Sequence, residues 1–270
     1  MDRGTEPTFR PRAVARALAV IIALLVAGLA GFLVAHGFTQ ITPASVVPVD
    51  PPAARAPTPA PPILGDIGRN DLASLVTVEA ELQNGSEESL GTGWILDSKG
   101  DVVTNAHVIS GNDALRVTDS ANHTHVARLL QSSASNDLAV IRVIGALAGT
   151  PLPVDPSLLT TVPLAVITLA SSRATGHADW TEEVLKTIHA TAPFTGSSTA
   201  SGQFSPAVYN DMLYLTGGRI YEGNSGGPVL DAKGQVIGIV TLAASTSAPD
   251  AYAIPISRVI SDLRTWVALG

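Results

Sequence analysis

A serine stands between glycines in the hexapeptide Gly-Asn-Ser-Gly-Gly-Pro at residues 223–228. Gly223 and Gly226 can adopt backbone angles that are closed to other residues. Successive N–H groups of such a turn can therefore point to one place and form an oxyanion hole beside the hydroxyl of Ser225. Pro228 fixes φ where the chain enters an extended run. The hexapeptide alone fits an ordinary Gly/Pro-rich turn as well as a nucleophile, so the rest of the chain must decide.

A nucleophilic hydroxyl needs a base, and the base needs a group that orients it. His107 directly follows an apolar strand and residues 104–106, which places it at a strand end facing a cleft. Asp137 comes thirty residues later at the start of another apolar strand. A lone carboxylate at that point is costly unless it has a partner, and an imidazole would be that partner. The other histidines are interpreted as lying at the membrane boundary or at the surface: His36, His123, His125, His177 and His189.

Three segments in the order His107, Asp137, Ser225 resemble the motifs of the chymotrypsin/trypsin clan of serine proteases. These segments are Thr-Asn-Ala-His-Val-Ile at 104–109, Asn-Asp-Leu-Ala-Val-Ile at 136–141 and the hexapeptide at 223–228. They are most similar to the disulfide-free bacterial branch, the HtrA-type (Deg) proteases, and the resemblance covers about residues 72–262. It is supported by Gly-Thr-Gly-Trp at 91–94 and Tyr-Ala-Ile-Pro-Ile at 252–256, which look like two further segments of that domain.

The resemblance implies a fold and a set of roles. The fold would be all-β, with two six-stranded antiparallel β-barrels, the site in the groove between them and a C-terminal helix. His107 would be the general base and acid, Asp137 its orienting partner and Ser225 the nucleophile. The N–H groups of Gly223 and Ser225 would form the oxyanion hole.

The same resemblance implies that Thr241, Leu242 and Ala243 belong to the strand that pairs with the substrate backbone, with Thr241 close to Asp137. Three charged residues fall near positions that line the primary specificity pocket in relatives, and we interpret them as rim charges instead: Arg219, Glu222 and Asp250. No substrate preference follows.

The chain departs from its relatives in two places. Between Ala170 and Asp211 the resemblance is absent, and loops in that region order the oxyanion hole in relatives. The printed sequence ends at Gly270, so we expect no PDZ domain after the protease domain. The leading hypothesis is a serine endopeptidase. Two alternatives stay open: a catalytically silent or gated peptide-binding or sensor domain on the same scaffold, and another serine hydrolase such as an esterase, which the chain order disfavours.

Secondary structure is predicted to consist mainly of short strands separated by turns, which is typical of sandwiches and barrels. Apolar residues at helical spacing predict one long helix over residues 257–269, with Ser257 as its cap. The strands are expected at residues 75–80, 91–96, 102–104, 114–117, 124–130, 138–143, 164–169, 184–190, 212–215, 229–230, 236–242 and 251–256.

The N-terminal part predicts a membrane anchor. Residues 1–16 carry four arginines, residues 17–35 carry no charge, and residues 36–65 are rich in proline. We expect a cytoplasmic N-terminus at 1–16, a transmembrane helix at 17–35, an extended extracytoplasmic linker at 36–65 and the protease domain at 66–270. A cleaved signal peptide followed by secretion is the alternative, although its apolar core would be shorter.

Composition excludes several other classes. The chain has 270 residues, no cysteine and a net charge of −7, so it holds together without disulfides and does not suit a nucleic-acid backbone. No cofactor and no metal site are indicated, because His123 and His125 alone are too sparse for a metal cage. The expected partners are a protein or peptide substrate, the membrane and, as in some relatives, further copies of the chain.

Overall fold

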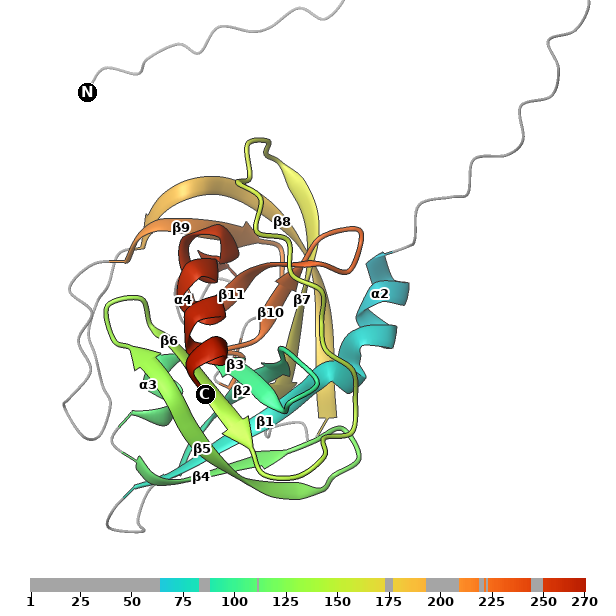
Figure 1. Ribbon diagram of the computed structural model, residues 1–270. Coiled ribbons are helices and arrows are strands. Elements are labelled where there is room, and N and C mark those ends of the chain that lie inside the picture. Colours follow the sequence, from blue (N-terminus) through green and yellow to red (C-terminus); the bar gives the residue numbers. More distant parts are fainter. Residues whose placement is uncertain are drawn as a thin grey trace, which may run out of the picture. The chain divides into compact units, whose positions relative to one another are not determined.

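The computed structural model describes residues 64–82, 88–110, 112–172, 177–192, 209–218, 221, 223–243 and 250–270. In this part of the chain the strands close into two six-stranded antiparallel barrels, followed by a C-terminal helix (Figure 1). This confirms the predicted all-β fold. The predicted cytoplasmic segment, transmembrane helix and most of the linker lie outside the described residues. Within them, no helix combines the length and the apolar character that a membrane span needs.

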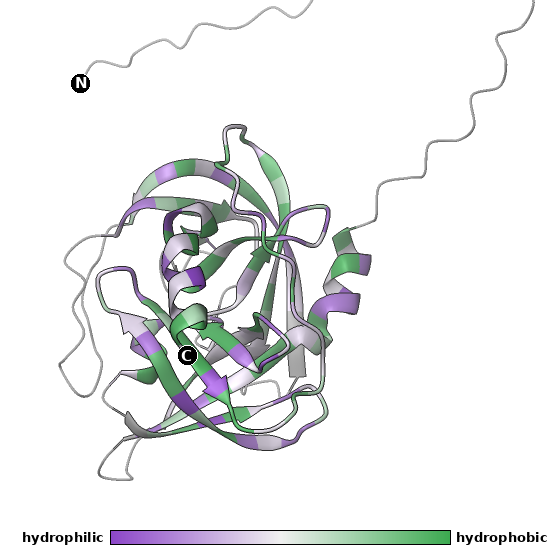
Figure 2. Ribbon diagram, viewed as in Figure 1, coloured by the Kyte–Doolittle hydropathy of each residue, from purple (hydrophilic) through white to green (hydrophobic). Residues whose placement is uncertain are grey.

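The first barrel contains six strands in the order β1-β2-β3-β6-β5-β4. Its core is made of branched aliphatic side chains on the inward face of each strand, including Val78, Val102 and Ile141, which are fully buried. Figure 2 shows hydrophobic and hydrophilic residues interspersed along these strands, as expected where one face is buried and the other is solvated. The strands are β1 (Leu75–Leu82), β2 (Glu88–Ile95), β3 (Asp101–Thr104), β4 (Asn112–Thr118), β5 (Thr124–Ser133) and β6 (Leu138–Val143).

The second barrel has the order β10-β11-β12-β9-β8-β7. Each predicted strand overlaps an observed one, and the largest difference is at β8, predicted from residue 184 and observed from His177. A hydrophobic cluster joins the two barrels, with Trp94 and Leu138 from the first and Ile167 and Met212 from the second. The strands are β7 (Leu164–Ser172), β8 (His177–Ala192), β9 (Tyr209–Thr216), β10 (Pro228–Leu230), β11 (Val236–Ala243) and β12 (Ala251–Pro255).

Three α-helices lie in the described part of the chain: α2 (Leu64–Asp71), the single turn α3 (Ala106–Ile109) and α4 (Ile256–Leu269). Helix α4 packs against β11 and β12 of the second barrel and against β5 and β6 of the first (Figure 1). The prediction of Ser257 as its cap is wrong. The helix begins at Ile256, and Pro255 occupies the cap position with φ −62° and ψ 133°; it makes no side-chain hydrogen bond because its ring carries no polar atom.

The pairing of β3 with β6 positions two of the predicted site residues. Asp101 lies opposite Arg142, and Thr104 lies opposite Ala139. The fully buried carboxylate of Asp101 accepts two hydrogen bonds from Arg142, at 2.6 and 2.7 Å, which fixes this register with a bidentate ion pair. The chain leaves β3 toward His107 and enters β6 directly after Asp137, so the same register brings these two residues together.

A carboxyl group is also buried in the second barrel, on strand β8. Glu183 is 3% exposed, and its Oε1 accepts a hydrogen bond of 2.8 Å from the hydroxyl of Thr168. Among the described residues, its Oε2 has no hydrogen-bond partner. Burial, together with the nearby charge of Asp250, raises the pKa of Glu183 from its ordinary value of 4.5 to about 7, and the bond from Thr168 offsets only part of this effect.

Because the pKa of Glu183 is raised in the folded protein, we predict that its contribution to the free energy of unfolding decreases as the pH rises. The folded protein keeps the proton of Glu183 up to about pH 7, whereas the unfolded chain loses it near pH 4.5. The stabilisation is therefore complete below pH 4.5 and is lost between pH 4.5 and 7. Urea unfolding should show that Glu183→Gln raises the free energy of unfolding at pH 8 by an amount on the order of 2 kcal/mol and changes it little at pH 4.5.

The matched control is Glu182→Gln, which alters the neighbouring, exposed carboxylate. It should change stability by less than about 0.5 kcal/mol at both pH values. Equal pH profiles for wild type and Glu183→Gln would contradict the prediction.

Candidate active site

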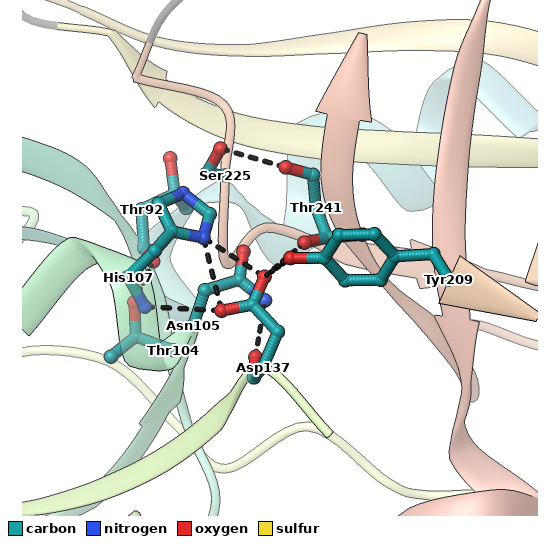
Figure 3. Close-up of polar contacts among 8 residues, drawn as sticks. All are labelled: Thr92, Thr104, Asn105, His107, Asp137, Tyr209, Ser225 and Thr241. Atoms are coloured by element: carbon teal, nitrogen blue, oxygen red, sulfur yellow. Dashed lines mark hydrogen bonds and ion pairs between the residues drawn. The ribbon is translucent and has the colours of Figure 1, made fainter. Parts of the chain in front are cut away.

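His107 and Asp137 form the centre of the candidate site (Figure 3). The Nδ1 atom of His107 lies 2.9 Å from Oδ2 and 3.0 Å from Oδ1 of Asp137, and the main-chain N–H of His107 donates to Oδ1 at 3.0 Å. The carboxylate thus fixes both the ring and the backbone of the histidine. His107 was expected at a strand end, but it lies in the single turn α3 that follows β3. This turn is what brings its own N–H into line with the carboxylate.

Asp137 also binds to the second barrel. Its Oδ2 accepts hydrogen bonds from the hydroxyl of Thr241 on β11 and from the hydroxyl of Tyr209 on β9, the latter at 3.2 Å. The carboxylate is completely buried, and Thr241 and Tyr209 are 2% and 3% exposed. Burial, and next the charge of Asp137, raise the pKa of Tyr209, so its hydroxyl is a donor at neutral pH. One side chain therefore joins elements of both barrels.

The backbone around Asp137 is held from two directions. Its φ is +49°, in the left-handed region that aspartate tolerates better than most residues. The side chain of Asn105 donates to the main-chain O of Asp137 at 2.8 Å. Asn136, the preceding residue, bonds to Asp262 and Arg258 of α4, each at 3.1 Å. The long C-terminal helix thus fixes the loop that presents the carboxylate.

Ser225 lies at the tip of the predicted nucleophile turn, in front of β10. Its hydroxyl donates to the main-chain O of Thr241 at 3.2 Å. In Figure 3 the imidazole of His107 lies between Asp137 and Ser225. Thr241 therefore contacts both ends of the arrangement, because its side chain binds Asp137 and its backbone binds Ser225.

The backbone of the turn is fixed by hydrogen bonds on three of its residues. Asn224 donates to Tyr221 O at 3.1 Å, Gly226 to Val240 O at 2.8 Å and Gly227 to Asn224 O at 3.0 Å. None of the hydrogen bonds described for this turn uses the N–H of the two predicted oxyanion-hole residues, Gly223 and Ser225. Gly223 has φ +93° and Gly226 has φ +89°, so the left-handed conformation expected from the glycines is present at both positions.

The remaining predicted residues have mixed outcomes. Leu242 and Ala243 continue β11, where they lie opposite Tyr252 and Ala251 of β12. Arg219 and Glu222 lie outside the described residues. Asp250 is partly buried and accepts a hydrogen bond of 2.7 Å from the hydroxyl of Tyr214, which raises the pKa of Tyr214 to about 12. This residue is therefore packed against a partner in the second barrel, which the interpretation as a rim charge did not foresee.

One of the supposed surface histidines is mostly buried. The side chain of His125 is 15% exposed, and its Nε2 lies 2.9 Å from the buried carboxylate of Asp119. Burial alone would raise the pKa of Asp119, but bonds from the N–H of Ala148, from His125 and from two further N–H groups outweigh it and lower the pKa to about 2. This cluster closes the turn between β4 and β5. Among the described residues, no group of three or more metal-binding side chains occurs.

The sequence pattern of the trypsin-like peptidase domain matches residues 91–239, more than half of the chain. The chain belongs to the trypsin-like peptidase family. This match contains the elements that carry His107, Asp137 and Ser225, and it confirms the resemblance drawn from the three motifs.

The relatives of this trypsin-like chain include HtrA-type proteases. It is 32% identical over 173 residues to "Protease Do-like 1, chloroplastic" of Arabidopsis thaliana, a match that covers 63% of this chain and 37% of that protein. It is 28% identical over 180 residues to "Serine protease Do-like HtrA" of Lactobacillus helveticus, covering 64% of this chain and 41% of that protein. The chain thus spans about two fifths of the length of these curated relatives.

Solved structures of proteases share its fold. The active form of the Rv3671c protease from M. tuberculosis superposes with a TM-score of 0.60 at 23% identity, covering 84% of this chain and 93% of that one. A serine endoprotease from Yersinia pestis also gives a TM-score of 0.60, at 22% identity, covering 77% and 68%. At these identities the likeness concerns the double-barrel fold.

Two residues of the site were missed by sequence reasoning. Asn105 was noted only as a neighbour of His107, although an amide directly before the histidine is a suitable donor for a nearby carbonyl. Tyr209 carried no signal, because it stands at the end of a region that does not resemble the relatives. Only the closure of β9 beside β12 brings its hydroxyl to Asp137.

Loss of the Tyr209 hydroxyl is expected to destabilise the site. Tyr209→Phe removes one of four hydrogen-bond donors to the completely buried carboxylate of Asp137 and leaves that charge less well compensated. Urea unfolding should therefore show a free energy of unfolding lower by about 1–3 kcal/mol than that of the wild type.

Tyr214→Phe is the matched control, since Tyr214 also donates to a carboxylate, that of Asp250. Because Asp250 is only partly buried, the loss of stability in Tyr214→Phe should stay below about 1 kcal/mol. The prediction is contradicted when both variants lose the same stability, or when neither does.

Proposed function

We propose that this chain is a serine endopeptidase that cleaves extended protein or peptide substrates through an acyl-enzyme. The observation that carries the proposal is the position of Thr241. Its hydroxyl binds the carboxylate that orients His107, and its carbonyl binds the hydroxyl of Ser225 (Figure 3). The carboxylate that orients the base and the hydroxyl of the nucleophile thus both contact Thr241.

The first step follows from this geometry. Ser225 turns its hydroxyl from Thr241 O toward Nε2 of His107, which takes the proton as Oγ attacks the substrate carbonyl carbon. The hydrogen bond between a nucleophile and its base is often loose in a free enzyme and tightens once substrate is bound. Asp137 keeps Nδ1 protonated and stabilises the imidazolium. The oxyanion receives hydrogen bonds from the N–H of Gly223 and Ser225.

The acyl-enzyme is then formed and hydrolysed. The imidazolium gives its proton to the leaving amine as the peptide C–N bond breaks, which leaves the acyl group on Oγ. Water attacks this ester with His107 as base, and the proton returns to Ser225 as the acid product leaves. No cofactor is needed for either half of the reaction.

One edge of strand β11 would bind an extended substrate. Residues 241–243 extend beyond the last partner on β10, which is opposite Ile239, and on the other side Leu242 and Ala243 pair with β12. The N–H and C=O groups on the side of β10 are therefore placed to pair with a peptide laid along this edge. The hydroxyl of Ser225 donates to Thr241 O on the same strand. A peptide bound along this edge would therefore lie next to the nucleophile.

The proposal predicts that activity depends on Ser225 and His107. Wild type should cleave an unfolded protein such as casein and react with a fluorophosphonate probe. Ser225→Ala should abolish labelling, and either Ser225→Ala or His107→Ala should lower kcat by about 10⁴-fold or more. Ser98→Ala, at an exposed serine of the turn between β2 and β3, is the control and should behave as wild type.

Two other outcomes would favour the silent or gated domain. One is capture of an extended peptide by wild type without turnover, unchanged in His107→Ala. The other is equal probe labelling of wild type and Ser225→Ala.

We also propose that residues 17–35 anchor the enzyme in a membrane with the protease domain outside the cytoplasm. This rests on nineteen uncharged residues after an arginine-rich segment. The full chain, made in bacterial cells, should resist carbonate extraction, and added protease should reach its barrels only from the periplasmic side. Mass spectrometry of its N-terminus checks the alternative, since a mature chain that begins after residue 35 would contradict the anchor.

A further inference from the structure

Thr92 lies between the first barrel and the nucleophile turn. It is fully buried in β2, where it pairs with Thr77 of β1. Strand β2 pairs with β3 only at Trp94 and Ile95. At Thr92 the strand instead turns its N–H to Ser225 O, at 2.8 Å. This segment of β2 therefore binds the turn of the second barrel in place of a neighbouring strand.

The hydroxyl of Thr92 binds a second point of the same turn. It donates to the main-chain O of Gly223 at 2.7 Å and lies 3.1 Å from the main-chain O of Ser171. It also accepts the N–H of Ser171 at 2.8 Å. A hydroxyl has one proton, so the two carbonyls compete for it, and the shorter distance favours Gly223.

Hydrogen bonds are the main restraint on Gly223 that the described residues provide. Among these residues, a Cβ added at Gly223 would meet only Ser171 O, at 3.9 Å, so their packing restrains it little. By contrast, a Cβ at Gly226 would lie 2.1 Å from Thr92 O, and that glycine is closely confined. Glycine has the widest choice of backbone angles, so a poorly confined Gly223 needs polar contacts to keep its φ of +93°.

Thr92 supplies these contacts at both sides of the oxyanion hole. Its hydroxyl holds the carbonyl of Gly223, and its N–H holds the carbonyl of Ser225. The peptide group after Gly223 is also held by the bond from Asn224 N to Tyr221 O, at 3.1 Å. Rotation about Gly223 would change the direction of its N–H, which is one of the two proposed donors to the oxyanion.

We infer that Thr92 is a positioning residue of the oxyanion hole, whose buried hydroxyl holds the Gly223 carbonyl and thereby directs the Gly223 N–H at the developing oxyanion. The inference rests on the proposed peptidase function. It gives Thr92 a role in the transition state that is separate from substrate binding. The simpler interpretation is that the hydroxyl only satisfies the main-chain N–H and C=O groups of Ser171, in which case its loss would affect stability alone.

The bond to Ser171 adds a link to the β7–β8 hairpin. Ser171 stands near the end of β7, and its own hydroxyl is bonded to Thr77. Because the same Thr92 hydroxyl binds Ser171 and Gly223, a shift of this hairpin end would change how firmly Gly223 is held. The part of the chain that least resembles the relatives is thus joined to the oxyanion hole by one side chain.

Thr92→Val is the test, because valine keeps the shape and removes the hydroxyl. Loss of one oxyanion-hole donor lowers kcat by about 10²–10³-fold, so a misdirected donor should lower it by about 10- to 100-fold with KM nearly unchanged. A peptide aldehyde forms a tetrahedral adduct with Ser225. The inhibition constant of this aldehyde should rise by the same factor. A plain peptide should bind Ser225→Ala equally well with and without Thr92→Val.

Three further variants complete the test. Thr92→Ser keeps the hydroxyl and should restore kcat to near the wild-type value. Thr92→Cys, a weaker donor in a chain without other cysteines, should lie between Ser and Val, and it serves if the valine variant does not fold. Thr118→Val is the control, because it removes a hydroxyl of the same barrel that is bonded to Thr124 instead, and its kcat should remain near that of wild type.

The outcomes separate this inference from the proposed function. An active wild type with unchanged kcat and aldehyde inhibition in Thr92→Val, and only a lower Tm, would overturn the inference alone. So would an equal weakening of aldehyde and plain-peptide binding. A wild type that neither cleaves protein nor reacts with the fluorophosphonate would overturn the proposed function, and this inference with it.

Discussion

The buried carboxylate of Asp137 is the interaction on which the arrangement of the site depends. A charge with no exposed surface is tolerated only when donors surround it. Here the donors are the ring and the backbone N–H of His107 and the hydroxyls of Thr241 and Tyr209. They come from one element of the first barrel and two strands of the second. Separating the barrels would leave this charge with half of its partners, so docking of the barrels and orientation of the base depend on each other.

The hydrophobic cluster between the barrels drives their association, and the polar contacts around Asp137 fix the position of one barrel relative to the other. Apolar burial is non-directional, so Trp94, Leu138, Ile167 and Met212 could tolerate small sliding movements between the barrels. Hydrogen bonds to a fixed carboxylate could not, since they weaken steeply with misalignment. Helix α4 adds a third constraint, because its contacts to Asn136 reach the residue next to Asp137. The chain achieves this without a single cysteine.

The sequence could predict what short-range patterns encode. Short apolar runs separated by turns located the strands, and the motifs around His107, Asp137 and Ser225 predicted which residues would meet. Helix α2 was missed because glycines at 65 and 68 argue against a helix. Gly68 is nevertheless needed there, because a Cβ at this position would lie 2.7 Å from the ring of Trp180. The burial of His125 and the role of Tyr209 depend on contacts between strands that are distant in the chain. Such contacts leave no local periodicity, and only the closed barrels reveal them.

Each contact that positions Ser225 comes from a different side, and this explains why the nucleophile can remain accessible. Thr241 binds its hydroxyl from the second barrel, and Thr92 binds its carbonyl from the first. Ser225 itself is only partly buried, whereas both threonines are almost fully buried. Rigid neighbours thus replace the packing that would otherwise hold the serine and block the substrate. The arrangement also has a cost, because among the described residues Asn105 Oδ1 and Trp94 Nε1 are buried without a hydrogen-bond partner close to this junction. Departures from complete polar satisfaction are expected where function constrains the fold. Here Trp94 lies on β2, two residues after Thr92, and Asn105 lies between β3 and the turn that carries His107.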